Sequence, residues 1–258
     1  MRMVSIAVYR PPSTTLELIR SLLDLDFLVV LWMNSIEELP AHSNLVCLGS
    51  GKNVGLSIAF NGFFDYALVR GINAFLFLDQ DALVFRSIVQ DFDKVIALKS
   101  FEDHAAVQLK DNAFGADLLT AKIVLSNGCV FNVECPVRHS KDFFVEGVDY
   151  DFCLNAALLD YSIGVVSSDS LVHEVMQPRT TYYINGSTFA HRPYPVRRQI
   201  EFLYALQKLA LRSLIARRLD FFIIFNRNIF THLAVQCRAG IFFALWRMRL
   251  IIRKDENF

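Results

Sequence analysis

The feature that most constrains the fold is a regular alternation of short apolar segments with stretches of helical spacing. Apolar runs at 4–8, 27–32, 74–78, 129–133 and 163–167 have the length of buried strands. Strands that alternate with helices predict an α/β domain with a mostly parallel, Rossmann-like sheet covered by helices. Ligands of such sheets bind beyond the carboxyl ends of the strands, and the polar clusters of this chain follow its expected strands.

Helical spacing predicts four helices in this part of the chain, at 13–23, 55–69, 87–98 and 150–159. A further strand is expected at 122–125, ahead of an Asn-Gly turn. We therefore expect residues 1–195 to form one α/β domain, which is a normal size for such a unit.

The sequence changes character at about residue 196. Residues 192–258 hold 13 Lys and Arg against 4 Asp and Glu, whereas residues 1–191 hold 13 against 22. Helical segments at 197–216, 221–235 and 241–252, which we expect to form two or three helices, make 196–258 a basic, amphipathic, aromatic appendage. Such a surface suits an anionic membrane interface. Packing on the first domain and association into a homodimer are open alternatives, whereas nucleic acid is not expected because no recognition module is present.

Targeting signals and cysteine usage indicate a compartment. The N-terminus lacks the pattern of a secretory signal peptide, and no uncharged apolar run reaches the roughly 18 residues of a membrane span. Five scattered cysteines without a CxxC pair favour buried thiols over a zinc site or a disulfide framework. We expect a cytoplasmic protein, held peripherally at the inner face of the cell membrane if the appendage binds lipid.

Two carboxylates directly follow the expected strand at 74–78, as Asp79-Gln80-Asp81. A strand end holds them rigidly at the mouth of the sheet. Mg²⁺ and Mn²⁺ prefer oxygen ligands and often take one or two carboxylates plus substrate phosphates. The pattern favours a metal and nucleotide site, although Asp-x-Asp also occurs by chance at turns.

A second polar cluster opens the expected helix at 55–69, as Asn53-Val-Gly55 with Asn61 further along. A glycine at a helix start lets the backbone approach a ligand closely, and exposed N–H groups there favour anions. Close packing of the helix through its small residues is the alternative explanation.

The third cluster lies at the start of the expected helix at 150–159, where Glu146, Asp149 and Asp151 follow one another. A helix N-terminus stabilises ionised carboxylates, so one of them can act as general base towards a sugar hydroxyl. His173 follows a later strand and is a candidate ligand of the metal or diphosphate. Arg197 and Arg198 carry the planar fork that suits diphosphate recognition.

The order of these motifs resembles the family 2 glycosyltransferases, and particularly their rhamnosyltransferase-like bacterial branch, from Val4 to about Arg198. Eight sequence elements carry the resemblance. In chain order they are Tyr9-Arg10-Pro11, Met33-Asn34-Ser35, Asn53 with Gly55, Ala59 and Asn61, Leu78 to Asp81, Ser126-Asn127-Gly128, Val148 to Cys153, His173, and Arg192 with Tyr194, Arg197 and Arg198. Two acids of the family pattern are absent, one before Asn34 and one before Asp149.

The resemblance implies a GT-A nucleotide-diphospho-sugar transferase fold and an inverting single displacement. It implies that Asp149 deprotonates the acceptor hydroxyl, with Asp151 beside it, and that Asp81 and His173 hold Mg²⁺ or Mn²⁺ with the donor diphosphate. Asp79 contacts the ribose or the metal shell. The remaining donor-binding positions that it implies are Tyr9, Asn34, Ser35, Asn53, Gly55, Asn61 and Gln80.

The expected substrates are a nucleotide sugar and a lipid-linked or growing cell-surface polysaccharide. Rhamnose from a dTDP donor is the branch-level expectation, with a hexose from UDP as the alternative. A non-catalytic nucleotide-sugar-binding or scaffold protein stays open because of the two absent acids. A nucleotidyltransferase is less well supported, because residues 8–14 are not a Gly-rich loop with Arg and Lys.

Overall fold

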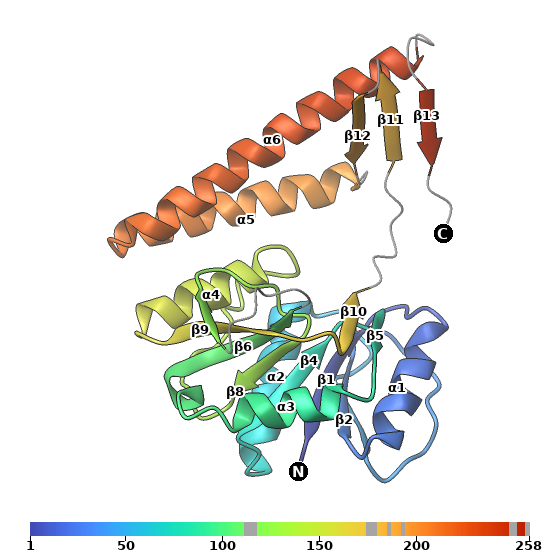
Figure 1. Cartoon of the computed structure of the whole chain (residues 1–258), viewed down its shortest axis with the longest axis vertical. Coiled ribbons are helices and arrows are strands. Elements are labelled where there is room, and N and C mark those ends of the chain that lie inside the picture. The colour runs from blue at the N-terminus through green and yellow to red at the C-terminus, as the bar shows by residue number, and fades with distance from the viewer. Residues whose placement is uncertain (111–117, 174–179, 185–186, 192–193, 248–251, 256–258) are drawn as a thin grey trace. The chain divides into compact units, whose positions relative to one another are not determined.

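A computed structural model describes residues 1–110, 118–173, 180–184, 187–191, 194–247 and 252–255 of the chain (Figure 1). The side chains of 172–193 and of all residues after 241 lie outside that description. The chain divides into two compact units, Met1–Glu174 and Val175–Phe258. Each unit is described by itself.

The first unit is built on an eight-stranded sheet in the order β3-β2-β1-β4-β8-β6-β9-β7. Its strands are β1 (Met3–Val8), β2 (Leu28–Met33), β3 (Leu45–Leu48), β4 (Ala74–Leu78), β6 (His104–Lys110), β7 (Leu119–Ala121), β8 (Cys129–Asn132) and β9 (Ser162–Ser167). β1, β2, β3 and β4 are parallel, as are β6 and β9, whereas β8 is antiparallel to both β4 and β6, and β7 is antiparallel to β9. This mostly parallel arrangement confirms the predicted α/β class.

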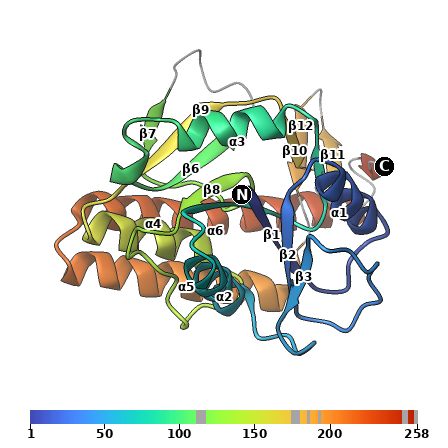
Figure 2. The same ribbon diagram turned by 90° about the horizontal axis from the view of Figure 1, so that it is seen from below.

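Helices cover both faces of the sheet (Figure 2). They are α1 (Thr14–Asp24), α2 (Leu56–Val69), α3 (Ile88–Ile96) and α4 (Val148–Leu158). Buried side chains of α1 and α3 join Leu76, Leu78 and Val130 of the sheet in one apolar cluster. Because side chains alternate along a strand, Phe75 and Phe77 point to the other face, towards α2.

That second face is an aromatic core. Phe60 and Phe64 of α2 pack on Phe131 of β8, and His139 stacks between Phe60 and Phe152 with ring centroids 4.2 and 4.7 Å apart. Burial lowers the pKa of His139 to about 3, so the ring is neutral at physiological pH. The histidine therefore packs as another aromatic core residue.

Two smaller elements complete this unit. β5 (Ala82–Val84) pairs antiparallel with β10 (Leu171–His173), which places β10 beside the chain that leaves Asp81. A short 3₁₀ turn (Phe101–Asp103) leads into β6.

The second unit contains the helical appendage and a small sheet. The long helices α5 (Val196–Ile215) and α6 (Leu219–Arg247) lie side by side, and β11 (Thr180–Ile184) pairs with both β12 (Ser187–His191) and β13 (Ile252–Asp255) (Figure 1). In the described part of the chain, no helix is both long and apolar enough to cross a membrane.

The sequence predicts two or three helices in the appendage, and the described residues form two, with the segments expected at 221–235 and 241–252 beginning in one continuous helix, α6. Two other expectations about elements were wrong. Residues 122–125 are not a strand, because the strand ends at Ala121 and the Leu125 carbonyl accepts hydrogen bonds from the side chains of Gln108 and Cys129. Ile252, expected at the end of a helix, begins the strand β13 instead.

Candidate active site

Side-chain hydrogen bonds of Gln80 and Ser35 connect the carboxyl ends of β1, β2 and β4. Its amide donates to the carbonyl of Tyr9 at 3.1 Å and accepts from the Tyr9 N–H at 2.9 Å. The buried hydroxyl of Thr15 donates to the Gln80 carbonyl at 2.8 Å. On the next strand, the Ser35 hydroxyl accepts from the Arg10 N–H at 2.9 Å and donates to Glu37. Tyr9, Ser35 and Gln80 thus lie together at the predicted edge of the sheet.

A cleft of about 320 Å³ opens at this edge and contains two of the predicted acids, Asp79 and Asp149. It is lined by Leu56, Phe77, Asp79, Gln108, Leu109, Lys110, Leu125, Ser126, Asn127, Asp149 and Leu171. Because Asp79 follows β4 and Asp149 lies in the first turn of α4, the fold brings together carboxylates that are seventy residues apart in sequence. The sequence placed both acids in one site, and the cleft is consistent with that prediction.

Asp149 is half-buried and held by Ser126. The Ser126 N–H donates to Asp149 Oδ1 at 3.2 Å, and the Ser126 hydroxyl donates to the same oxygen. Burial raises the pKa of Asp149, the two Ser126 hydrogen bonds oppose that rise, and Glu146 adds to it. A carboxylate made more basic by burial is well suited to accept a proton.

Asp79 carries the clearest electrostatic signal of the site. Burial and the negative charges of Asp149 and Asp81 raise the pKa of Asp79 to about 7. A divalent cation beside these carboxylates would offset the repulsion and favour the ionised form. Within the described part of the chain, no three His, Cys, Asp or Glu side chains form a metal-binding group. Asp79 and Asp81 supply carboxylate oxygens, which are the type of ligand that hard divalent cations prefer.

Asp151, predicted beside the base, has a structural role. It is fully buried, its Oδ2 accepts from the Ser140 N–H at 2.7 Å and from Asn155 at 3.1 Å, and its Oδ1 accepts from the Ser140 hydroxyl at 2.9 Å. These donors fix the loop before α4 to the helix. The carboxylate does not line the cleft.

Three N–H groups at the start of α2 are used by the protein itself. The Val54 N–H donates to the buried side chain of Asn34, the Gly55 N–H to Asn53, and the Leu56 N–H to the Phe144 carbonyl. Gly55 has φ +88°, and a Cβ there would lie 2.6 Å from the Phe144 carbonyl oxygen. The glycine is thus required by close backbone packing, and binding of an anion at this helix start stays a prediction.

Asn61 is also used by the protein itself. Its amide donates to the His139 carbonyl at 2.9 Å and accepts from the His139 N–H at 3.1 Å. The reciprocal pair ties α2 to the loop before α4. This use differs from the predicted contact with the donor.

Asp81 does not line the cleft, and the described residues give no placement there for His173, Arg197 or Arg198. The backbone of His173 pairs with Ala82 in β10, but its side chain lies outside the described residues. Arg197 and Arg198 belong to the second unit. There, Arg197 pairs with Glu201 at 2.8 Å, and the Arg198 guanidinium lies 4.5 Å from the centre of the Tyr194 ring.

Sequence reasoning missed two polar residues of the cleft, Gln108 and Lys110, and it named Asn127 only as part of the Ser126-Asn127-Gly128 motif. Lys110 places a cation at the end of β6, and Gln108 and Asn127 hold the backbone around the acids. The side-chain Oδ1 of Asn127 accepts from the Asp79 N–H at 2.9 Å. The available signal was the position of Lys110 at the carboxyl end of an apolar strand, which is the same rule that located Asp79.

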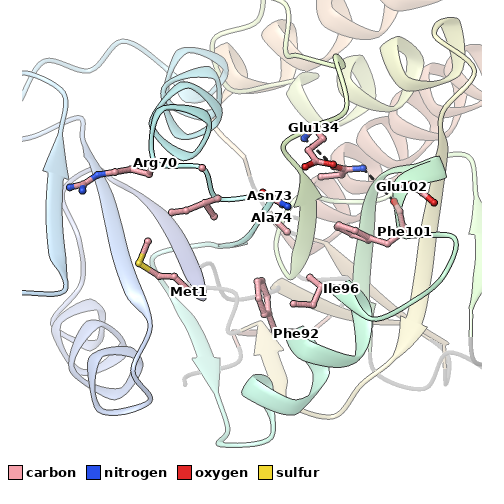
Figure 3. Close-up of a pocket in the computed structure, with 12 residues that line it drawn as sticks. Met1, Arg70, Asn73, Ala74, Phe92, Ile96, Phe101, Glu102 and Glu134 are labelled. Atoms are coloured by element: carbon pink, nitrogen blue, oxygen red, sulfur yellow. Dashed lines mark hydrogen bonds between the residues drawn. The ribbon is translucent and has the colours of Figure 1, made fainter.

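A larger cavity, of about 570 Å³, lies at the opposite edge of the sheet (Figure 3). Its lining includes Ala74, the first residue of β4, whereas Asp79 follows the last. Figure 3 shows Glu102 and Glu134 on its wall together with Phe92 and Phe101. Asp79, Asp81 and Asp149 do not line this cavity, so size alone does not identify the candidate site.

Comparison with solved structures supports the fold assignment. The chain is similar to residues 1–349 of S. aureus TarS in complex with UDP-GlcNAc, with a TM-score of 0.53 and 17% identity over 83% of this chain and 67% of that one. A longer TarS structure gives a TM-score of 0.52 and 17% identity over 83% of this chain and 40% of that one. The chain therefore spans less than half of the longer TarS chain. At this identity the similarity shows a shared fold.

The other comparisons found no match: no protein-family model and no curated protein sequence matches the chain. The predicted GT-A class, with its mostly parallel sheet and C-terminal helices, is confirmed by the observed topology and by the TarS structures.

Proposed function

We propose that the chain is an inverting, divalent-metal-dependent glycosyltransferase that uses a nucleotide-diphosphate sugar. The observation that carries this proposal is the cleft at the carboxyl edge of the sheet that is lined by both Asp79 and Asp149. One acid follows a strand and suits a metal and nucleotide, and the other opens a helix and suits a base. A non-catalytic binding protein has no need of a basic, half-buried carboxylate in its cleft.

Asp149 accepts the proton of an acceptor hydroxyl in the proposed reaction. As this O–H bond breaks, the acceptor oxygen forms a bond to the anomeric carbon of the donor. The bond from that carbon to the diphosphate breaks on the opposite face, and the nucleoside diphosphate leaves with the electron pair. Attack from the face opposite the leaving group inverts the anomeric configuration.

Asp79 and Asp81 would hold Mg²⁺ or Mn²⁺, with His173 as a further candidate ligand. A bound cation supplies stabilisation of the charge that develops on the departing diphosphate. Tyr9, Ser35 and Gln80 form a hydrogen-bonded platform beside these acids, where the nucleotide of the donor would lie. Asn34 and Asn53 support that platform indirectly, by holding the backbone at residues 54 and 55.

The donor is a nucleotide sugar. TarS binds UDP-GlcNAc with the same fold, which supports a UDP-sugar as strongly as the motifs favour dTDP-rhamnose. The acceptor class is a lipid-linked or growing cell-surface polysaccharide.

The second unit would hold the enzyme at an anionic membrane surface that presents such an acceptor. Its helices carry large apolar side chains that are more than half exposed, among them Ile200, Tyr204, Ile223 and Phe230. Exposed cations lie on the same helices, among them Arg227 and Arg238 on α6, and Arg217 lies in the turn between α5 and α6. Apolar and cationic groups together are what an interfacial helix requires.

The test is release of nucleoside diphosphate by the purified full chain with Mn²⁺, an acceptor-containing membrane fraction and a panel of dTDP- and UDP-sugars. We expect turnover with one donor, an activity loss of about 10²–10⁴-fold in Asp149→Asn, and loss in Asp81→Ala. Glu17→Gln, an exposed acid on α1, is the matched control and should behave as wild type. Saturable donor binding without turnover across the panel would instead establish the non-catalytic alternative.

A further inference from the structure

The two acids of α4 are held in different ways. Asp151 accepts hydrogen bonds on both carboxylate oxygens, from Ser140 and Asn155, as a structural carboxylate does. Asp149 accepts two hydrogen bonds within the described chain, and both end on Oδ1. Its Oδ2 therefore remains available to a hydroxyl that enters the cleft.

Both donors to Oδ1 belong to one residue, Ser126. Its side chain is only 6% exposed, so its hydroxyl is confined to this contact. Two donors from one residue, the N–H and the hydroxyl, fix the position of an oxygen more tightly than a single donor, because the carboxylate can turn about one hydrogen bond. The bonding pattern therefore holds Oδ1 in place and leaves Oδ2 outside this contact.

The backbone around Ser126 is itself held from two strands. The Gln108 amide on β6 donates to the Leu125 carbonyl at 2.8 Å and to the Asn127 carbonyl at 3.3 Å. The Gly128 N–H donates to the Phe77 carbonyl of β4 at 2.9 Å. Asn127 in turn accepts from the Asp79 N–H, so the segment 125–128 spans the two acidic halves of the site.

We propose that Ser126 is a positioning residue that holds Oδ1 of Asp149 and thereby presents Oδ2 to the acceptor hydroxyl. The inference rests on the proposed transferase function for its chemical meaning. Its structural part, that Ser126 fixes the orientation of the carboxylate, stands independently of that function. Ser126 does not touch substrate in this scheme and acts through Asp149.

The experiment compares Ser126→Ala and Ser126→Thr with wild type in the full chain. Kinetics of sugar transfer give kcat and the KM for the donor, and crystal structures of both variants give the Asp149 side-chain orientation. Loss of a hydrogen bond to a carboxylate predicts a roughly 10- to 100-fold fall in kcat for Ser126→Ala. The donor KM should stay within about twofold, because Ser126 acts on the base alone. Ser126→Thr keeps the hydroxyl and should restore most of kcat.

Ser5→Ala is the matched control. Ser5 is a fully buried serine on β1 whose hydroxyl donates to the Leu76 carbonyl at 3.3 Å, away from either acid. If Ser5→Ala loses as much activity as Ser126→Ala, the loss follows from removing any buried hydroxyl. That result would overturn the proposal. An unchanged kcat in Ser126→Ala would overturn it as well.

Crystal structures of wild type and both Ser126 variants test the positioning role of Ser126 separately from the proposed transferase function. If wild type transfers no sugar, a turned Asp149 carboxylate in Ser126→Ala, with its original orientation kept in Ser126→Thr, still supports positioning by Ser126. The same Asp149 orientation in all three proteins overturns the positioning role, whether or not the chain is a transferase.

Discussion

At the scale of single residues, Asp79 links the candidate site to the stability of the fold. Its pKa of about 7 in the folded chain is far above the ordinary value of 3.8. The folded state therefore binds a proton more tightly than the unfolded state, and stability falls as the pH rises from about 4 to 7. The expected loss is on the order of 1–2 kcal/mol, after allowance for solvent screening.

Substitution of Asp79 by asparagine should remove this dependence. In metal-free buffer, Asp79→Asn should be more stable than wild type at pH 8 and nearly equal to it at pH 4, as measured by urea unfolding. Mn²⁺ should stabilise wild type at pH 8 but not the variant, because cation binding and ionisation of Asp79 favour each other. Asp24→Asn, an exposed acid on α1, is the control. Parallel pH profiles for Asp79→Asn and wild type would contradict the electrostatic account.

Single residues also show what sequence could predict about the site. Asp79 and Asp149 were found because each is marked by local pattern, one at a strand end and the other at a helix start. Asn61 fits its motif equally well, but its partner His139 is 78 residues away, so its use in the core was invisible in sequence. Asp151 was similarly engaged by Ser140 across a loop. Local pattern predicts where a polar group lies, and long-range packing decides what it binds.

At the scale of elements, the contact between α2 and β2 depends on a glycine. A Cβ on Gly62 would lie 2.0 Å from Cζ3 of the Trp32 ring, which packs edge-on to Phe63 at 6.4 Å. Gly62→Ala should destabilise the fold by about 1–3 kcal/mol, because this clash outweighs the roughly 1 kcal/mol by which alanine favours a helix.

Gly240 provides the matched comparison for that substitution. It lies within α6, and a Cβ there would meet nothing within 4 Å. Gly240→Ala should therefore raise stability by about 0.5–1 kcal/mol. Urea unfolding of both variants measures the difference. Equal stability of the two variants would show that Trp32 moves aside without cost, and would remove the packing reason for this glycine.

The individual strands also show which parts of the fold could be predicted from the sequence and which could not. The buried strands β1, β2, β4, β8 and β9 were predictable, because each is an apolar run bounded by turns. Residues 122–125 have the same apolar character, yet they form a loop whose carbonyls accept from Gln108 and Cys129. An apolar run of four residues does not distinguish a strand from a buried loop, and the choice depends on partners distant in the chain.

At the scale of the whole molecule, charge separates the chain into two parts. The acidic part contains the cleft, and the basic part contains α5 and α6. The compact units divide after Glu174, whereas the change in composition lies near residue 196. The strands β11 and β12 fall between these two points. Strands in the second unit could not be foreseen from its helical composition, because β11 pairs with β13 more than sixty residues away.

The basic helices predict binding of the full chain to anionic membranes. Sedimentation with vesicles should show binding to phosphatidylglycerol-containing bilayers and much weaker binding to neutral phosphatidylcholine. Reversal of Arg227 and Arg238 to glutamate should weaken anionic binding by roughly 10²–10³-fold, because each cation contributes about 1 kcal/mol and its reversal about twice that. The matched control reverses Arg20 and Lys99, two exposed cations of the first unit. If the two double variants bind equally, the exposed apolar face of α5 and α6 instead serves a protein contact, and a dimer at equilibrium in sedimentation would identify a second copy as its partner.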